Sequence, residues 1–110
     1  MPKIRTDLMQ GTLELLILKT LSNDSMHGYG IAQRIHAAVD DLLKIEDGSL
    51  YPALNRMLVK GWLASEWGIS ENNRKARFYK LTPEGRKQLA READEFERLV
   101  QMIQQVMRTV

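Results

Sequence analysis

The final quarter of the chain carries apolar residues at a spacing that places them on one face of a helix. They recur at intervals of four, three, four, three and four: Leu89, Ala93, Phe96, Val100, Ile103 and Met107. This seam predicts one helix from Pro83 to about Arg108, about 26 residues or 39 Å long. The chain has only 110 residues, and the single modest core that it can build is too small to cover such a helix. We therefore expect a second copy of the chain to cover the seam; the alternative is packing back on its own domain.

The composition indicates a globular chain without disulfide bonds. Apolar residues make up 44%, which argues against disorder. Cysteine is absent, which excludes a disulfide framework and a thiolate metal site and fits the cytoplasmic location that we expect. The start, MPKIRTDLMQ, lacks the apolar stretch of a signal peptide. The longest apolar run, LELLILKTL, is interrupted by Glu14 and Lys19, so no membrane span is expected.

Positive charge is concentrated in one stretch. Residues 60–80 hold five cations and two carboxylates, a local charge of +3, and the net charge of +2 leaves −1 for the rest of the chain. The tract NNRKARFYK, residues 72–80, has four cations and no acid. Such a block on a near-neutral body can contact phosphates, and the alternative is an ordinary solvated loop.

Two short helices are expected in the first half of the chain. In GTLELLILKTL, residues 11–21, positions 13, 16, 17, 20 and 21 follow helical spacing. Leu15 and Leu18 lie on another face and are also apolar, and we expect a partner chain to cover that face. After the turn NDSMHGYG, the segment IAQRIHAAV, residues 31–39, predicts a second short helix.

The segment GSLYPALNRMLVKGWL, residues 48–63, predicts a third helix. Asp47 or Ser49 can cap its start, Pro52 fits a first turn, and Gly61 ends it. The expected core stripe is apolar, with Tyr51 at its edge: Leu50, Leu54, Met57 and Leu58. The opposite face carries small or polar groups and one valine: Gly48, Ser49, Pro52, Asn55, Arg56 and Val59.

After Gly61 the pattern changes from helix to strand. WLASEW and RFYKLT are rich in aromatic residues and nearly alternate, and the polar stretch GISENNRKA lies between them. These features predict a two-stranded hairpin with a long basic tip. Thr82, Pro83 and Glu84 then give a hydroxyl cap, a first-turn proline and an acid near the positive end of the last helix.

Three helices, a hairpin and a long helix form the layout of a winged helix-turn-helix, mainly α with a small β-hairpin, followed by a dimerisation helix. We expect the winged domain to span residues 1–82 and the dimerisation helix residues 83–110. In this fold the third helix lies in the major groove of DNA, and the hairpin, or wing, reaches the backbone or minor groove. The residues expected to contact DNA are Ser49, Tyr51, Pro52, Asn55, Arg56, Lys60, Arg74, Lys75 and Arg77.

Each of these residue types suits a different part of DNA. The hydroxyls of Ser49 and Tyr51 can donate to phosphates, as can Lys60 and the wing cations. Asn55 suits adenine and Arg56 suits guanine. The competing interpretation makes Tyr51 a half-buried core residue, Pro52 a helix starter, and Asn55 and Arg56 solvated side chains.

Four segments resemble the PadR family of transcriptional regulators: GTLELLIL at 11–18, HGYGI at 27–31, GSLYPALNRMLVKGWL at 48–63 and RFYKLTPEGR at 77–86. The single carboxyl-terminal helix is similar to the short subgroup of that family. The resemblance implies a homodimeric, sequence-specific DNA-binding regulator, usually a repressor, in which Ser49, Tyr51 and the wing cations contact DNA. It also implies that Leu8 to Leu21 packs against the partner's last helix.

The dimer interface expected on these grounds comes from the first and last helices: Leu15, Leu18, Leu89, Phe96, Leu99, Val100, Ile103 and Met107. Some relatives bind flat aromatic compounds between the two subunits with aromatic side chains. Here the last helix offers Phe96, Met102 and Met107, whereas Trp62 and Trp67 fall in the hairpin. No cofactor is expected, and a small hydrophobic effector at the interface stays open.

Other functional classes find less support in the sequence. His27 and His36 stand nine residues apart without a carboxylate cluster, so we expect no metal site, and His27 is expected to support the turn before the second helix. The sequence contains no nucleophile–base pairing, carboxylate dyad or glycine-rich phosphate loop, so we do not expect an enzyme. The alternative function is a winged-helix module that docks a protein, which would not need a cationic wing.

Overall fold

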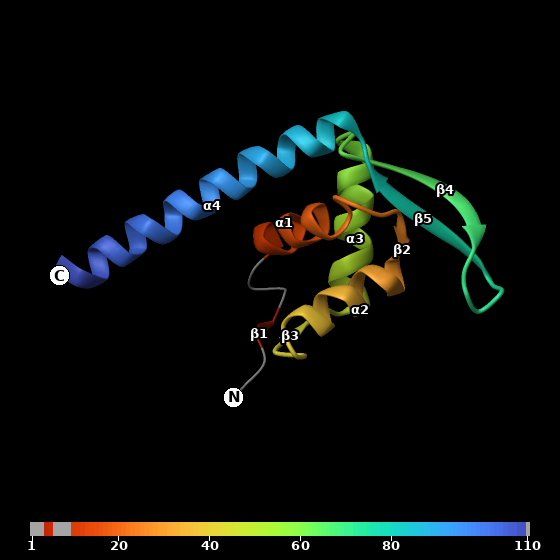
Figure 1. Ribbon diagram of the computed structural model, residues 1–110, viewed down its shortest axis with the longest axis horizontal. Helices are drawn as coiled ribbons and strands as arrows, with labels where there is room; N and C mark the ends of the chain where they lie inside the picture. The colour runs from red at the N-terminus through yellow and green to blue at the C-terminus, as the bar shows by residue number, and fades with distance from the viewer. Residues whose placement is uncertain (1–3, 6–9, 110) are drawn as a thin grey trace.

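The computed structural model describes residues 4–5 and 10–109 of the chain. In these residues the helices are α1 (Gln10–Thr20), α2 (Gly28–Ala38), α3 (Asp47–Val59) and α4 (Pro83–Thr109). The strands are β1 (Ile4–Arg5), β2 (Met26–His27), β3 (Leu43–Lys44), β4 (Leu63–Ile69) and β5 (Lys75–Leu81). Leu8, the predicted start of the segment that faces a partner, lies outside the described residues. The structure is a winged helix-turn-helix with a long last helix, as predicted (Figure 1).

The core lies where α1, α2 and α3 pack together and where the base of the hairpin closes on them. Its buried members come from all these elements: Leu13, Ile17, Leu18, Leu21, Ile31, Ile35, Ile45, Leu50, Ala53, Leu54, Met57, Leu63, Tyr79 and Leu81. The predicted core positions Leu50, Leu54 and Met57 are buried, and Leu58 packs against them from a partly buried position. The helical stripes of the sequence therefore point inward as expected.

The prediction that Leu18 faces a partner chain is wrong. Its side chain is 0% exposed within the single chain. Helix α1 packs against α2, α3 and α4 of its own chain, so α4 covers a side of α1 that the sequence seemed to leave open. Leu15 keeps partial exposure, and Leu89, expected at the dimer seam, is half-buried against the core of its own chain.

Helix α3 begins earlier than the sequence suggested. Its N-cap is Glu46, whose carbonyl accepts hydrogen bonds from the N–H groups of Ser49 and Leu50, both at 2.9 Å. The predicted caps are wrong, because Asp47 and Ser49 both lie inside the helix. Pro52 consequently lies inside the helix rather than in its first turn.

Gly61 ends α3 as predicted. Its φ is +79°, a left-handed conformation that costs glycine little. The Gly61 N–H donates to the Leu58 carbonyl and the Trp62 N–H donates to the Met57 carbonyl, both at 3.0 Å. These two bonds form a Schellman motif, which satisfies carbonyls at the end of the helix.

The predicted hairpin forms, but it belongs to a three-stranded sheet. Strands β4 and β5 pair antiparallel from Leu63↔Leu81 to Ile69↔Lys75, and β2 adds to the other side of β5. Strand β2 was not predicted, because two residues are too few for an alternating pattern. We call residues 63–81, the hairpin with its turn, the wing.

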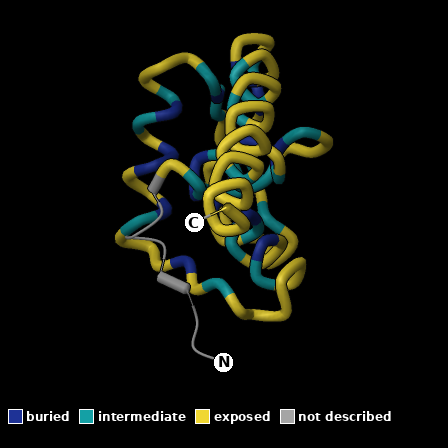
Figure 2. Tube along the Cα trace, turned by 90° about the vertical axis from the view of Figure 1, so that its left-hand side faces the viewer, coloured by how far each residue is buried: buried dark blue, intermediate teal, exposed yellow. Residues whose placement is uncertain are grey.

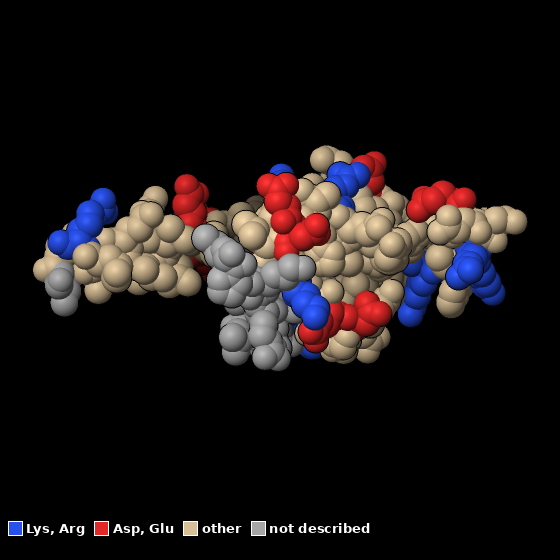
Figure 3. Space-filling model, turned by 90° about the horizontal axis from the view of Figure 1, so that it is seen from below, with Lys and Arg blue, Asp and Glu red and all other residues tan. Residues whose placement is uncertain are grey.

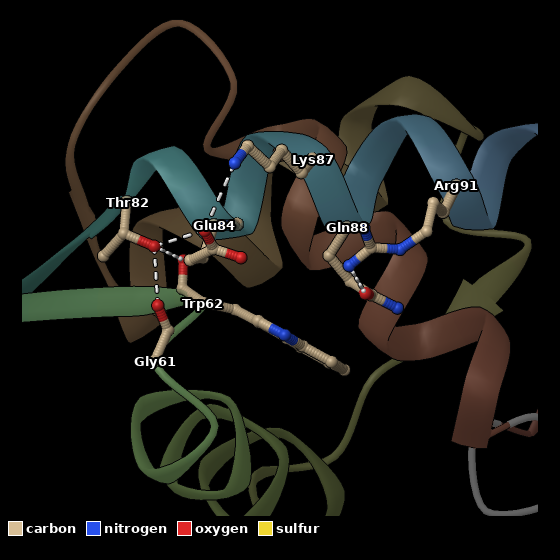
Figure 4. A network of polar contacts seen from close by, with 8 residues as sticks. Gly61, Trp62, Thr82, Glu84, Lys87, Gln88 and Arg91 are labelled. Atoms are coloured by element: carbon tan, nitrogen blue, oxygen red, sulfur yellow. Dashed lines mark hydrogen bonds and ion pairs between the residues drawn. The ribbon is translucent and has the colours of Figure 1, made fainter.

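Helix α4 is held at its first turn and then leaves the domain. Thr82 caps it as predicted, because its Oγ1 accepts the Gly85 N–H at 3.0 Å, and its hydroxyl donates to the Gly61 carbonyl at 2.6 Å (Figure 4). Beyond its first turns the helix projects from the domain and is largely exposed (Figures 1 and 2). Its large exposed apolar side chains are Phe96, Leu99, Met102, Ile103, Val106 and Met107.

Candidate nucleic-acid interface

A hollow of about 380 Å³ opens where α3, the start of α2 and the wing meet. We call it the wing hollow. Tyr51 of α3 and Tyr29 of α2 line it, together with His27 and Gly28 beside them. From the wing it receives three cations, Arg74, Lys75 and Arg77, and also Trp67 and Tyr79. The structure thus gathers four of the predicted DNA-contact residues, Tyr51 and the three wing cations, around one concavity.

The wing cations share a face because of the strand register. Lys75, Arg77 and Tyr79 are every second residue of β5, so their side chains lie on one face of the sheet. On β4, Trp67 stands opposite Arg77 and Ser65 stands opposite Tyr79. Arg77 Nε donates to Ser65 Oγ at 2.9 Å, which holds the guanidinium beside the strand. In Figure 3 basic side chains gather on one side of the wing end of the molecule and acidic ones on the other. The hollow therefore presents a cationic wall.

The Tyr51 side chain extends from α3 to the start of α2. Its ring packs so closely on Gly28 that a Cβ there would lie 2.7 Å from the Tyr51 Cε1 atom. Tyr51 is 45% exposed and does not belong to the hydrophobic core cluster. Partial burial raises the pKa of the Tyr51 hydroxyl above its ordinary value of 10.0, and the Asp47 carboxylate and Tyr79 add to this. The hydroxyl is therefore protonated at neutral pH and can donate a hydrogen bond.

His27 connects the start of α2 to the wing. Its Nδ1 accepts the Gly30 N–H at 3.0 Å and so caps α2. Its Nε2 lies 3.7 Å from the Glu71 carboxylate, and its ring meets Phe78 edge-on at 5.3 Å. The prediction that His27 supports the turn before the second helix is confirmed, and the residue also ties that turn to the wing.

Arg56 does not lie with the other predicted contacts. Its Nε lies 3.4 Å from Glu14 Oε1 of α1, and the Glu14 side chain is nearly buried. This ion pair turns Arg56 toward α1. The contact of Arg56 with guanine stays a prediction. Lys60 lies 4.5 Å over the Trp62 ring at the other end of α3, away from the wing hollow.

The remaining predicted residues of α3 lie outside the wing hollow. Pro52 and Asn55 are exposed, and Ser49 is half-buried. Val59, at the far end of the same outer face, is 81% exposed. This strip is accessible to a partner, and two of these four residues, Ser49 and Asn55, have side chains with both a donor and an acceptor.

Two aromatic residues of the wing hollow, Tyr29 and Trp67, were not among the predicted site residues. They are 61% and 64% exposed. Tyr29 followed a turn signal and Trp67 stood in an alternating strand pattern, so neither position suggested a site. What brings them together is the pairing of β2 with β5, which aligns the start of α2 with the wing.

Two further properties concern the described part of the chain only. No helix there combines the length and the apolar character needed to cross a membrane. Within the same residues, His, Asp and Glu side chains nowhere gather in groups of three or more that could hold a metal ion. His36 has a structural role, because its Nε2 accepts the Ile45 N–H at 3.1 Å.

Comparison with known proteins gives concordant results. The sequence model of the Transcriptional regulator PadR-like family matches residues 17–91. A transcriptional regulator from Clostridium thermocellum is similar in structure, with a TM-score of 0.82 and 29% identity over 90% of this chain and 96% of that one. A PadR family transcriptional regulator from Eggerthella lenta has a TM-score of 0.78 and 28% identity, over 94% of this chain and 88% of its own. The chain belongs to the PadR-like family of transcriptional regulators.

Proposed function

We propose that the protein is a homodimeric, sequence-specific DNA-binding regulator that represses transcription. The observation that carries this proposal is the wing hollow, where Arg74, Lys75 and Arg77 face Tyr51 of α3. When α3 lies in the major groove, the adjacent DNA backbone passes beside the wing. The phosphates of that backbone can then contact these cations. Because the proposed partner is DNA, we place the protein in the cytoplasm.

In the proposed complex, α3 and the wing have different tasks. Asn55 is exposed on the outer face of α3 and has the donor and acceptor that pair with adenine. Tyr51 and the wing cations contact phosphates, which position the helix but carry no sequence information. Ser49 and Pro52 lie beside Tyr51 along α3 and approach the same strand, and Lys60 is a phosphate contact only at the far end of the helix.

The proposed dimer rests on the exposed apolar side chains of α4. Phe96, Leu99 and Ile103 are about half exposed in the single chain, and Val100 and Met107 continue the same face. So much apolar surface on one helix is typical of an association surface. We propose that a second copy covers it, with Leu15 of α1 at its margin, and that two α3 helices then read half-sites about 34 Å apart.

Repression requires nothing beyond this arrangement, because a dimer bound across a promoter blocks access to it. The division at residues 82 and 83 is part of the proposal, with the winged domain binding DNA and α4 holding the copies together. No cofactor is assigned. A small hydrophobic effector between the copies remains a prediction.

The wing provides the direct test. We expect Arg74→Ala with Lys75→Ala to weaken binding to every duplex and to reduce the slope of log affinity against log salt by about 2. The matched control is Lys87→Ala with Arg91→Ala, which removes the same charge from exposed positions of α4. Equal effects of the two variants would mean that only net charge matters, and an unchanged affinity of the wing variant would favour a module that docks a protein.

A further inference from the structure

The aromatic side chains of the wing hollow have no role in the function as proposed so far. Trp67 is 64% exposed and Tyr29 is 61% exposed, and both line the hollow that holds the wing cations. Exposed indole and phenol rings leave apolar surface in water, and such surface gathered around a concavity is typical of a binding site. The hollow therefore offers apolar contact as well as positive charge.

The register of the wing fixes how these two kinds of group alternate. Trp67 stands directly opposite Arg77, and Lys75 is the next residue on the same face of β5. The Lys75 ammonium lies 5.0 Å from the centre of the Trp67 ring, within the range of a cation–π contact. The indole thus contacts one cation, Lys75, stands opposite a second, Arg77, in the strand register, and also lines the hollow.

The opposite wall is built from hydroxyls. The Tyr29 hydroxyl accepts a hydrogen bond from Gln33 Nε2 at 2.8 Å, which leaves its own proton to donate outward. Partial burial raises the pKa of the Tyr51 hydroxyl, so this group is protonated at neutral pH and can donate. Donors on one wall and cations with an indole on the other suit a ligand that alternates anionic and apolar groups.

A protein partner fits this lining less well than a nucleic acid does. An apolar protein surface would desolvate Arg74, Lys75 and Arg77 without neutralising them, which is costly. The backbone of duplex DNA instead alternates phosphates with apolar deoxyribose rings along the outside of the helix. It therefore satisfies the cations and the indole together, without any base leaving the stack.

We propose that the wing hollow seats the sugar–phosphate backbone of one DNA strand, with the Trp67 indole packed on a deoxyribose and the Tyr29 hydroxyl on an adjacent phosphate. This inference rests on the proposed function and adds two contact residues to it. The competing role for Trp67 is to hold Lys75 in place. The two roles differ in their salt dependence, because an apolar contact releases no counterions whereas a lysine–phosphate contact does.

The experiment measures binding of Trp67→Ala to a duplex from the region upstream of the protein's own gene, by anisotropy across a salt series. We expect affinity to fall about tenfold at every salt concentration, equivalent to about 1.4 kcal/mol, with an unchanged slope. Ile69→Ala is the matched control, because Ile69 is equally exposed on the same face of β4 but does not line the hollow. It should bind as the wild type does.

Tryptophan emission supplies a second measurement. The chain has two tryptophans, so Trp67→Phe leaves Trp62 as the one that reports. We expect DNA to shift or quench wild-type emission clearly more than Trp67→Phe emission, in which only Trp62, beneath Lys60, reports. Unchanged affinity of Trp67→Ala, or a loss of affinity that comes with a flatter salt slope, would overturn the sugar contact while DNA binding stands. Failure of the wild type to bind any duplex would instead remove the proposed function.

Discussion

Tyr51 owes its position to the missing side chain of Gly28. The ring lies where a Cβ on Gly28 would be 2.7 Å from Cε1 and 2.8 Å from the hydroxyl oxygen. The Tyr51 side chain is half exposed and can swing outward, so a Cβ at Gly28 would reorient the Tyr51 ring and would destabilise the fold little. A substitution at Gly28 can therefore displace the Tyr51 hydroxyl without removing it.

We predict that Gly28→Ala lowers DNA affinity while leaving the free energy of unfolding within about 1 kcal/mol of the wild type. Tyr51→Phe, which removes the hydroxyl directly, should lower affinity about tenfold or more, as expected for a hydrogen bond to a charged phosphate. Anisotropy and thermal unfolding together check both variants. If Gly28→Ala still weakens binding in a Tyr51→Ala background, Gly28 acts by some route other than the ring.

The residue scale also shows where sequence reasoning succeeds and where it fails. Gly61 was predictable because its role depends on local backbone geometry. Arg56 was not, because a helical wheel gives its direction but not its neighbour, and Glu14 lies 42 residues earlier in the chain. The wing cations were predictable as a group from composition, but their common face follows from the strand register.

At the scale of elements, the junction of α3, β4 and α4 sets the direction in which the last helix leaves the domain. The Thr82 N–H donates to the Trp62 carbonyl at 3.1 Å, and the Thr82 hydroxyl bonds the Gly61 carbonyl (Figure 4). Gly85, in the first turn of α4, is buried against the Trp62 carbonyl, and any Cβ would overlap that oxygen. Because the obstacle is backbone, it cannot rotate away.

Gly85→Ala should therefore destabilise the protein by about 1–3 kcal/mol, the range for overpacking. Urea unfolding measures this loss. Gly11→Ala is the control, since a Cβ at Gly11 meets nothing within 4 Å and alanine favours the helix by roughly 0.5–1 kcal/mol. A Gly85→Ala protein as stable as the wild type would show that α4 shifts at no cost.

A second element-scale prediction concerns Glu92, on the part of α4 that faces α1. Burial raises the pKa of its carboxyl above the ordinary 4.5, Glu14 and Glu95 add to this, and Gln88 and Lys60 oppose it. Its Oε2 is buried without a hydrogen-bond partner among the described residues. The folded state thus holds the proton more tightly than the unfolded state, and ionisation at neutral pH destabilises the fold.

Glu92→Gln should raise the melting temperature at pH 7. The gain in the free energy of unfolding should be at most about 1 kcal/mol, because the group is only partly buried and water screens it. The advantage should shrink as pH falls through the raised pKa and vanish below 4.5, where the wild-type carboxyl is protonated in both states. Melting curves of both proteins from pH 4 to 8 test this. A difference that is constant with pH would mean that ionisation of Glu92 is not its cause.

The three-stranded sheet and the early start of α3 mark the limit of prediction for elements. Strand β2 has two residues and exists because β5 offers a free edge there, a fact of tertiary structure. Helix α3 begins at Asp47 because backbone hydrogen bonds to Glu46 stabilise its first turn without a capping side chain. The long periodic segments were predicted well, because their patterns extend over many residues.

For the whole molecule, shape is the main argument for assembly. The chain extends 55 × 34 × 21 Å, and α4 supplies much of the long dimension (Figure 1). The apolar seam on the far part of α4 was the clearest feature of the sequence, and in the structure it remains exposed. Leu18, by contrast, is buried in the core of the single chain, and Leu89 packs partly against that core, so the interface that we propose lies further along the helix.

We predict that Phe96→Asp with Val100→Asp converts the dimer to a monomer, because two charges on the seam would be buried without partners. Light scattering across a concentration series measures the mass. The monomer should keep the fold of its winged domain by circular dichroism and lose most of its affinity for DNA with two half-sites. A dimer that persists in this variant would show that the interface lies elsewhere.

The central claim is that the protein binds DNA with sequence preference through α3 and the wing. Fluorescence anisotropy across a salt series, with the duplex upstream of the protein's own gene beside a scrambled duplex, tests it most directly. We predict tight binding to the first duplex, a steep fall in affinity with salt, and much weaker binding to the scrambled duplex. Weak and equal binding to both duplexes would contradict the claim.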